Sequence, residues 1–144
     1  MKALFSATLI SAVMIAGCTP ETTGGSASVS MDAARSVSTV EEFLSLGGRQ
    51  LTEAEFKAEL VDVTLAEGTW TWTIHGDGTH DSAANDGSWK DQGGTWRLVD
   101  GRYCRVGGSG GREQCSTAYR LGSIYRFADS DNASQLSGWS VTRG

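Results

Sequence analysis

Polar and apolar residues alternate strictly from Thr69 to Ile74, so that Trp70, Trp72 and Ile74 share one face and three threonines share the other. A period of two residues is typical of a β-strand with one buried face. From Val61 onward, similar short stretches recur between turns rich in glycine, aspartate and asparagine. The second half of the chain is therefore predicted to consist of short strands joined by tight turns.

One of these turns carries a specific signal. Asp100-Gly101 separates two stretches of β-forming residues, and this dipeptide favours a two-residue hairpin because both central residues of a type I′ turn need a positive φ. Such a turn would place Leu98 opposite Tyr103 on neighbouring antiparallel strands. The dipeptide therefore predicts the register as well as the turn.

Two capping boxes predict short helices before the first strand. Thr39 precedes Glu42 by three residues, and Thr52 precedes Glu55 in the same way. In each pair the threonine side chain can accept a hydrogen bond from the backbone N–H of the glutamate, whose carboxylate can bond back to the threonine. A helix is predicted over 52–60.

These elements predict one mainly β domain over residues 39–144. We expect a small antiparallel meander or barrel of about seven or eight strands, preceded by one or two short helices. Closure into a barrel would leave no edge strand with unpaired backbone N–H and C=O groups.

The first seventeen residues differ from the rest of the chain. Lys2 is followed by an apolar run over 3–15, and Ala16-Gly17-Cys18 comes next. A positive start, a short apolar core and small residues at the cleavage point are typical of an export signal, and the run is shorter than the roughly 20 residues of a transmembrane helix. Residues 1–17 are therefore predicted to be a signal peptide.

The end of this run resembles the lipobox of bacterial lipoproteins. The resemblance implies cleavage before Cys18, acylation of its thiol and amino group with chains such as palmitate, and anchoring of the protein to a membrane. Two or more acyl chains give stable anchoring, whereas one gives marginal binding. Residues 18–38, rich in Thr, Ser, Gly and Ala, would form a flexible tether. Thr19 in place of aspartate favours the outer membrane, with the domain facing the periplasm.

Charge and the other two cysteines fit an exported protein. The formal net charge is −5, and removal of the signal peptide loses Lys2 but no acidic residue. An acidic surface argues against nucleic acid as a partner. Because the periplasm is oxidising, Cys104 and Cys115 are predicted to form a disulfide. A cross-link that closes a loop of this size would stabilise the fold by roughly 3 kcal/mol. A two-thiol metal site is the alternative.

Five tryptophans in so short a chain need a place in the fold. Trp70, Trp72 and Trp96 fall in predicted strands and are candidate ligand-facing aromatics of a pocket. The alternative is that most of these large rings fill a small core, where each buries 150–250 Å².

No stretch of the chain predicts a catalytic, metal or cofactor site. Residues 107–111 fit the pattern Gly-x-Ser-x-Gly, yet no helix is predicted to follow and both histidines lie upstream. His75, Asp77, His80 and Asp81 offer metal-ligating groups but are interpreted as residues of a polar turn. Six arginines between positions 97 and 126 could form an anion-binding patch or be scattered solvated residues.

The segment Gly94-Thr95-Trp96-Arg97 followed by two cysteines resembles a family of small exported proteins of Gram-negative bacteria, over about residues 51–142. The resemblance implies a β-fold and pairing of the cysteines, but no activity. A weaker likeness is to barrel-shaped periplasmic inhibitors of proteases or lysozyme. We therefore expect a lipid-anchored, non-enzymatic binding or structural module. The alternative is an inhibitor that presents a rigid loop, 107–111 or 77–86, to a secreted hydrolase.

Overall fold

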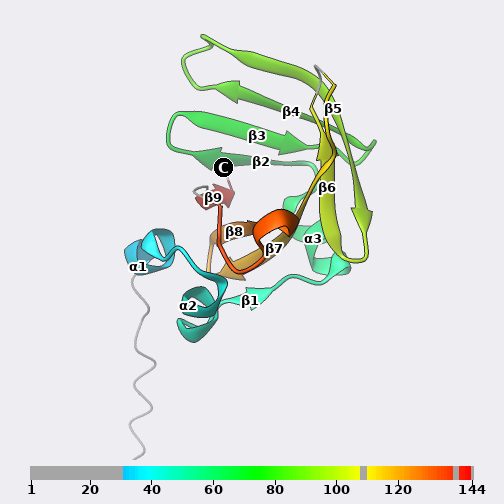
Figure 1. Ribbon diagram of the computed structural model, residues 1–144. Helices are drawn as coiled ribbons and strands as arrows, with labels where there is room; N and C mark the ends of the chain where they lie inside the picture. The colour runs from blue at the N-terminus through cyan, green and yellow to red at the C-terminus, as the bar shows by residue number, and fades with distance from the viewer. Residues whose placement is uncertain (1–30, 108–109, 138–139, 144) are drawn as a thin grey trace, which may run out of the picture.

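The computed structural model describes residues 31–107, 110–137 and 140–143 (Figure 1). Eight strands follow one another along the chain, each antiparallel to the next. They are β2 (Val63–Glu67), β3 (Trp70–Ile74), β4 (Thr79–Ala84), β5 (Lys90–Val99), β6 (Arg102–Val106), β7 (Gln114–Leu121), β8 (Ile124–Asp129) and β9 (Ser140–Arg143).

The last strand closes the sheet on the first. Leu65 of β2 pairs with Arg143 of β9, and Ala66 pairs with Thr142. The eight strands therefore form an up-and-down antiparallel barrel, which confirms the predicted fold class. A further two-residue strand, β1 (Arg49–Gln50), pairs with the end of β7.

The helices are short and precede the barrel. They are α1 (Met31–Ser36), α2 (Val40–Ser45) and α3 (Glu53–Leu60), and a 3₁₀ turn, η1 (Ser130–Asn132), follows β8. Both predicted capping boxes are present, at Thr39 and Thr52. No helix in the described part of the chain is both long and apolar enough to cross a bilayer.

Helix α3 closes one end of the barrel. Phe56 and Leu60 of α3, together with Leu51, are buried in the main core with Leu65 and Ile74 of the first two barrel strands. Leu51 lies just before the capping threonine and Phe56 four residues after it, the arrangement of a hydrophobic staple. The staple thus sets the angle at which the helix enters the barrel.

Helices α1 and α2 cover the outer face of β7 and β8 instead. Ala34 and Phe43 of these helices form a second core with Ile124 and Ala128 of β8. The segment 31–38, predicted as the end of a tether, therefore belongs in part to the folded domain, because Ala34 is completely buried. Cys18 and the rest of the predicted signal and tether lie outside the described residues.

One polar segment differs from the sequence prediction. The strand beside it, β5, runs through Gly93-Gly94, and its register with β4 shifts between His80 and Ser82. The polar segment after Asp77, expected to be a turn, contains β4. The Asp100-Gly101 hairpin is confirmed: both residues have positive φ, 52° and 73°, and Leu98 pairs with Tyr103.

Candidate functional site

The barrel has an open end opposite α3, which we call the mouth. Because neighbouring strands are antiparallel, the last residues of β2, β4, β6 and β8 lie at the same end as the first residues of β3, β5, β7 and β9. Two cavities are built from residues at this end, so the mouth is where a ligand could enter.

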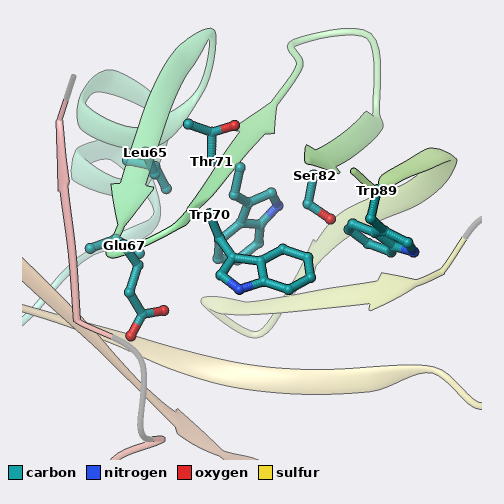
Figure 2. Close-up of a pocket in the computed structure, with 8 residues that line it drawn as sticks. Leu65, Glu67, Trp70, Thr71, Ser82 and Trp89 are labelled. Atoms are coloured by element: carbon teal, nitrogen blue, oxygen red, sulfur yellow. The ribbon is translucent and has the colours of Figure 1, made fainter. Parts of the chain in front are cut away.

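The first cavity has a volume of about 420 Å³, within the range of small-molecule sites. Its wall consists of the end of β2, the start of β3, the adjoining parts of β4 and β9, and the turn before β5 (Figure 2). The lining residues are Leu65, Glu67, Trp70, Thr71, Trp72, Ser82, Trp89 and Val141.

Strand register explains why the tryptophans of β3 face this space. Trp70 and Trp72 are two residues apart and share the inner face with Ile74. Trp72 pairs with Ser82 on β4, which places the serine on the same inner face. Trp72 is buried, whereas Trp70 nearer the rim is 46% exposed. The alternating pattern in the sequence therefore produces one aromatic wall.

Trp89 joins this wall from a different part of the chain. Its ring centroid lies 4.9 Å from that of Trp70, with an edge-to-face angle of 67°. Trp89 is 44% exposed. Figure 2 shows the Trp70 and Trp89 side chains together with Ser82 and Glu67, and Glu67 pairs in register with Trp70. The two rings form the aromatic part of the rim.

Glu67 brings a carboxylate to the edge of the first cavity. Its Oε1 accepts a hydrogen bond of 3.0 Å from the backbone N–H of Ser140. Burial raises the pKa of Glu67, while the Ser140 N–H and the charge of Arg126 act in the opposite direction. The carboxylate is thus held in a partly desolvated position with one fixed donor.

The second cavity, of about 430 Å³, has a more polar lining. Its residues are Trp72, Tyr103, Arg105, Gln114, Ser116, Phe127, Asp129 and Ser137. Trp72 lines both cavities and so stands between them. The Arg105 guanidinium lies 5.4 Å from the centroid of the Trp72 ring, and Ser116 Oγ donates to Asp129 Oδ1 at 2.6 Å. Burial also raises the pKa of Tyr103.

Of the three predicted ligand-facing tryptophans, two line a cavity. Trp96 does not: its ring lies 6.0 Å from Phe56 in the core, and its Nε1 donates to the His75 carbonyl at 2.8 Å. Trp89 was not predicted to face a ligand, because it adjoins a turn in a polar stretch and no periodicity marks it. Only the pairing of β4 with β5 brings it to the rim.

Cys104 and Cys115 are directly opposite each other on β6 and β7 and form the predicted disulfide, with 3.9 Å between their Cα atoms. They lie on the outer face, away from both cavities. Arg97, which pairs in register with Cys104, holds Glu113 through two hydrogen bonds of 2.9 and 3.0 Å. The position of the disulfide therefore indicates a structural role and not a role in ligand binding.

The histidine and aspartate cluster does not converge on one point. His75 Nε2 lies 3.0 Å from Asp81 Oδ2 on the outside of the barrel, whereas His80 is buried inside and Asp77 bonds to Thr79. Among the described residues the one group of metal-ligating atoms close enough to share an ion is Cys104, Glu113 and Cys115, and its two sulfurs form the disulfide. Ser109 lies outside the described residues.

The arginines do not form one patch. Arg97, Arg112 and Arg120 each pair with a different carboxylate, on Glu113, Asp131 and Glu59. Arg126 is 3% exposed, and its guanidinium donates to the carbonyls of Ala34, Arg35, Val37 and Ser137. It therefore ties α1 to the barrel instead of binding a solvent anion.

No protein-family model, no curated protein and no solved structure matches this chain. The resemblance to small exported proteins and the lipobox therefore stay predictions.

Proposed function

We propose that this protein is a lipid-anchored cell-envelope module that binds a small, largely apolar ligand in the mouth of its barrel, without acting as an enzyme. The observation that carries the binding role is the first cavity, in which three tryptophans converge with Leu65 and Val141 around about 420 Å³. Eight strands leave an interior that side chains can just fill or that can hold one small ligand.

The distribution of the core supports this role. Side chains fill the half of the barrel next to α3, where Phe56 contacts Trp96 and Tyr103. At the mouth, large rings line a hollow and remain half exposed at the rim. Exposed aromatic surface is costly in water, so a concave aromatic rim favours an occupant.

The inhibitor alternative has less support. Of the two segments expected to reach an enzyme, 77–86 consists mainly of β4, whose backbone is paired on both sides. A strand inside a barrel cannot enter a protease cleft as a protruding loop. The other segment, 107–111, includes two residues outside the described part of the chain.

Binding in the cavity is tested with N-phenylnaphthylamine, a neutral apolar dye that fluoresces when it leaves water. The full chain with Cys18→Ser keeps lipid and detergent out of the assay. Ser82→Phe should fill the cavity and weaken dye binding about tenfold or more, because the added ring overlaps the ligand volume. Thr64→Phe places the same ring on the exposed outer face of β2 and should leave binding unchanged. Equal dye affinity in both variants would refute binding in this cavity.

Anchoring is tested separately, in cells. The native chain should incorporate labelled palmitate and fractionate with membranes, and Cys18→Ser should do neither. Cys104→Ala/Cys115→Ala, which removes the other two cysteines, should still be labelled. If the native chain stays unlabelled and soluble in the cytoplasm, the anchoring proposal fails, while the dye experiment still decides the binding proposal.

A further inference from the structure

The first cavity has a chemical character that narrows the ligand class. Among the described residues that line it, Glu67 is the one charged side chain, and it is an acid. The others are three tryptophans, two aliphatic residues and two hydroxyl residues. A wall of this kind is apolar over most of its surface and negative at one edge.

Tryptophan rings attract cations as well as apolar groups. The face of an indole carries negative electrostatic potential, and aromatic cages of such rings recognise quaternary ammonium groups. Trp72 already shows this behaviour toward the second cavity, where the Arg105 guanidinium lies 5.4 Å from its ring centroid. Trp70 and Trp89 present their rings at the rim of the first cavity.

We propose that the first cavity binds an organic cation, with a quaternary or otherwise substituted ammonium group held among Trp70, Trp89 and Glu67. This inference rests on the proposed ligand-binding function and specifies the ligand class. The apolar substituents of the cation would contact Trp72, Leu65 and Val141 deeper in the barrel. The ammonium group would stay near the rim, where Glu67 pairs in register with Trp70 and both line the cavity (Figure 2).

The charges around the cavity favour this placement. Arg105 lines the second cavity and not the first, so Trp72 separates it from the proposed ammonium position. The charge of Arg126 acts on Glu67, but the Arg126 guanidinium already donates hydrogen bonds to four backbone carbonyls. Arg35 bonds to Ser140 Oγ on the outer face. None of these three arginines lines the first cavity.

An anionic ligand would meet the opposite conditions. Its charged group would lie next to the Glu67 carboxylate in a partly desolvated site, where like charges repel strongly. The overall charge of −5 would also slow its approach. A neutral ligand would gain nothing from Glu67 beyond a hydrogen-bond acceptor.

The test compares choline with its neutral isostere, the alcohol in which a tert-butyl group replaces the trimethylammonium group. The two molecules have nearly the same shape, so their affinity ratio isolates the charge. Binding to the full chain with Cys18→Ser is measured by tryptophan fluorescence and by calorimetry at constant ionic strength. We expect choline to bind about tenfold more tightly than the isostere, from the combined cation–π and carboxylate attraction.

Two variants, each of which removes one negative charge, test whether the preference for choline depends on Glu67. Glu67→Gln keeps an acceptor for the Ser140 N–H and should reduce the preference for choline to about threefold or less. Asp86→Asn removes a carboxylate from the exposed turn before β5, outside the cavity lining, while its side-chain oxygen can still accept from the Ser88 N–H. This control should keep the full preference.

The outcomes separate the two proposals. If the isostere binds as well as choline, or if Asp86→Asn and Glu67→Gln lower the preference equally, the cation inference is overturned and ligand binding in the barrel stands. If the apolar dye binds but neither choline nor the isostere does, the cation inference is likewise overturned and ligand binding in the barrel stands. If dye, choline and isostere all fail to bind, the proposed function itself is refuted.

Discussion

The imidazole of His80 occupies the space that a side chain at position 94 would take, so Gly94 and His80 are fitted to each other inside the barrel. They pair in register on β5 and β4. A Cβ atom built on Gly94 would collide with the His80 ring and would lie 2.6 Å from the Val106 carbonyl oxygen. The glycine therefore serves a close approach between strands and leaves room for a buried histidine.

Gly94→Ala should destabilise the protein by about 1–3 kcal/mol, because the added methyl group must displace a buried ring or a strand backbone. Gly107→Ala is the control: a Cβ there meets nothing within 4 Å, and the φ of Gly107 lies outside the strained positive range. Denaturant unfolding of both variants measures the difference. Equal stability of the two variants would show that the His80 contact is easily relieved.

The stability of the domain should fall as the pH drops below 6.5, because of His80. Burial lowers its pKa, with the Arg105 charge adding to the effect, while the Val106 carbonyl, Asp91 and Asp81 oppose it. The carbonyl can only accept, so Nε2 carries the proton of the neutral ring in their 3.2 Å contact. Below the unfolded pKa the unfolded chain takes up a proton that the folded chain does not bind, which favours unfolding.

His80→Gln should remove this pH-dependent component, even though it also lowers the stability at neutral pH. The free energy of unfolding is measured between neutral pH and pH 5 for the native protein, His80→Gln and His75→Gln. His75 lies on the outside beside Asp81, so its variant should keep the His80 component. A native protein as stable at the acidic limit as at neutral pH would contradict the prediction.

The parts of the fold that follow from local chemistry were predictable, and the rest depends on distant partners. The Thr39 and Thr52 capping boxes and the Asp100-Gly101 turn act over a few residues, so short motifs reveal them. β4 was missed because its residues are polar or small: of its inward side chains, His80 is buried against Gly94 and Ser82 lines the first cavity, and neither is apolar. Local patterning cannot indicate such a strand.

The site was predictable to the same extent. The alternation around Trp70 and Trp72 placed both rings on one face, and they do share the first cavity. The same reasoning could not separate Trp96, which is on an inward face but lies at the α3 end, from residues nearer the mouth. Trp89 and Glu67 join the site through strand pairing and barrel closure, which no motif in the sequence encodes.

Arg126 should be among the most costly polar residues to remove. Its side chain is on the outer face of β8 yet 3% exposed, because α1 covers it, and it donates to four carbonyls. Three of these carbonyls, on Ala34, Arg35 and Val37, lie at or just after the last turn of α1, where a cation also complements the helix dipole.

Arg126→Met should cost about 3 kcal/mol or more, because buried carbonyls lose a charged donor. Arg97→Met is the matched control: the Arg97 side chain is 66% exposed, and an exposed ion pair contributes about 1 kcal/mol or less. Unfolding in denaturant compares the two. Amide hydrogen exchange should also show α1 opening in Arg126→Met alone. If both variants lose a similar amount of unfolding free energy, water replaces the Arg126 guanidinium at the four carbonyls without a cost in stability.

The disulfide should stabilise the fold without taking part in ligand binding. Cys104 and Cys115 are eleven residues apart in sequence and directly opposite each other on β6 and β7. Their bond therefore restricts the conformations of the unfolded chain, and in the folded chain it joins two residues that the strand pairing already brings together. The chain-entropy model gives roughly 3 kcal/mol for a loop of this size.

Cys104→Ala/Cys115→Ala should therefore lower the free energy of unfolding by about 2–4 kcal/mol, and reduction of the native protein should lower it by a similar amount. Both bridge residues face away from the two cavities, so the folded variant should bind N-phenylnaphthylamine with the native affinity. Dye binding measured well below the denaturation midpoint checks this separation. If the variant is fully folded but loses the dye, the bridge positions the mouth as well as stabilising the barrel, since β6 and β7 also carry Arg105 and Ser116 of the second cavity.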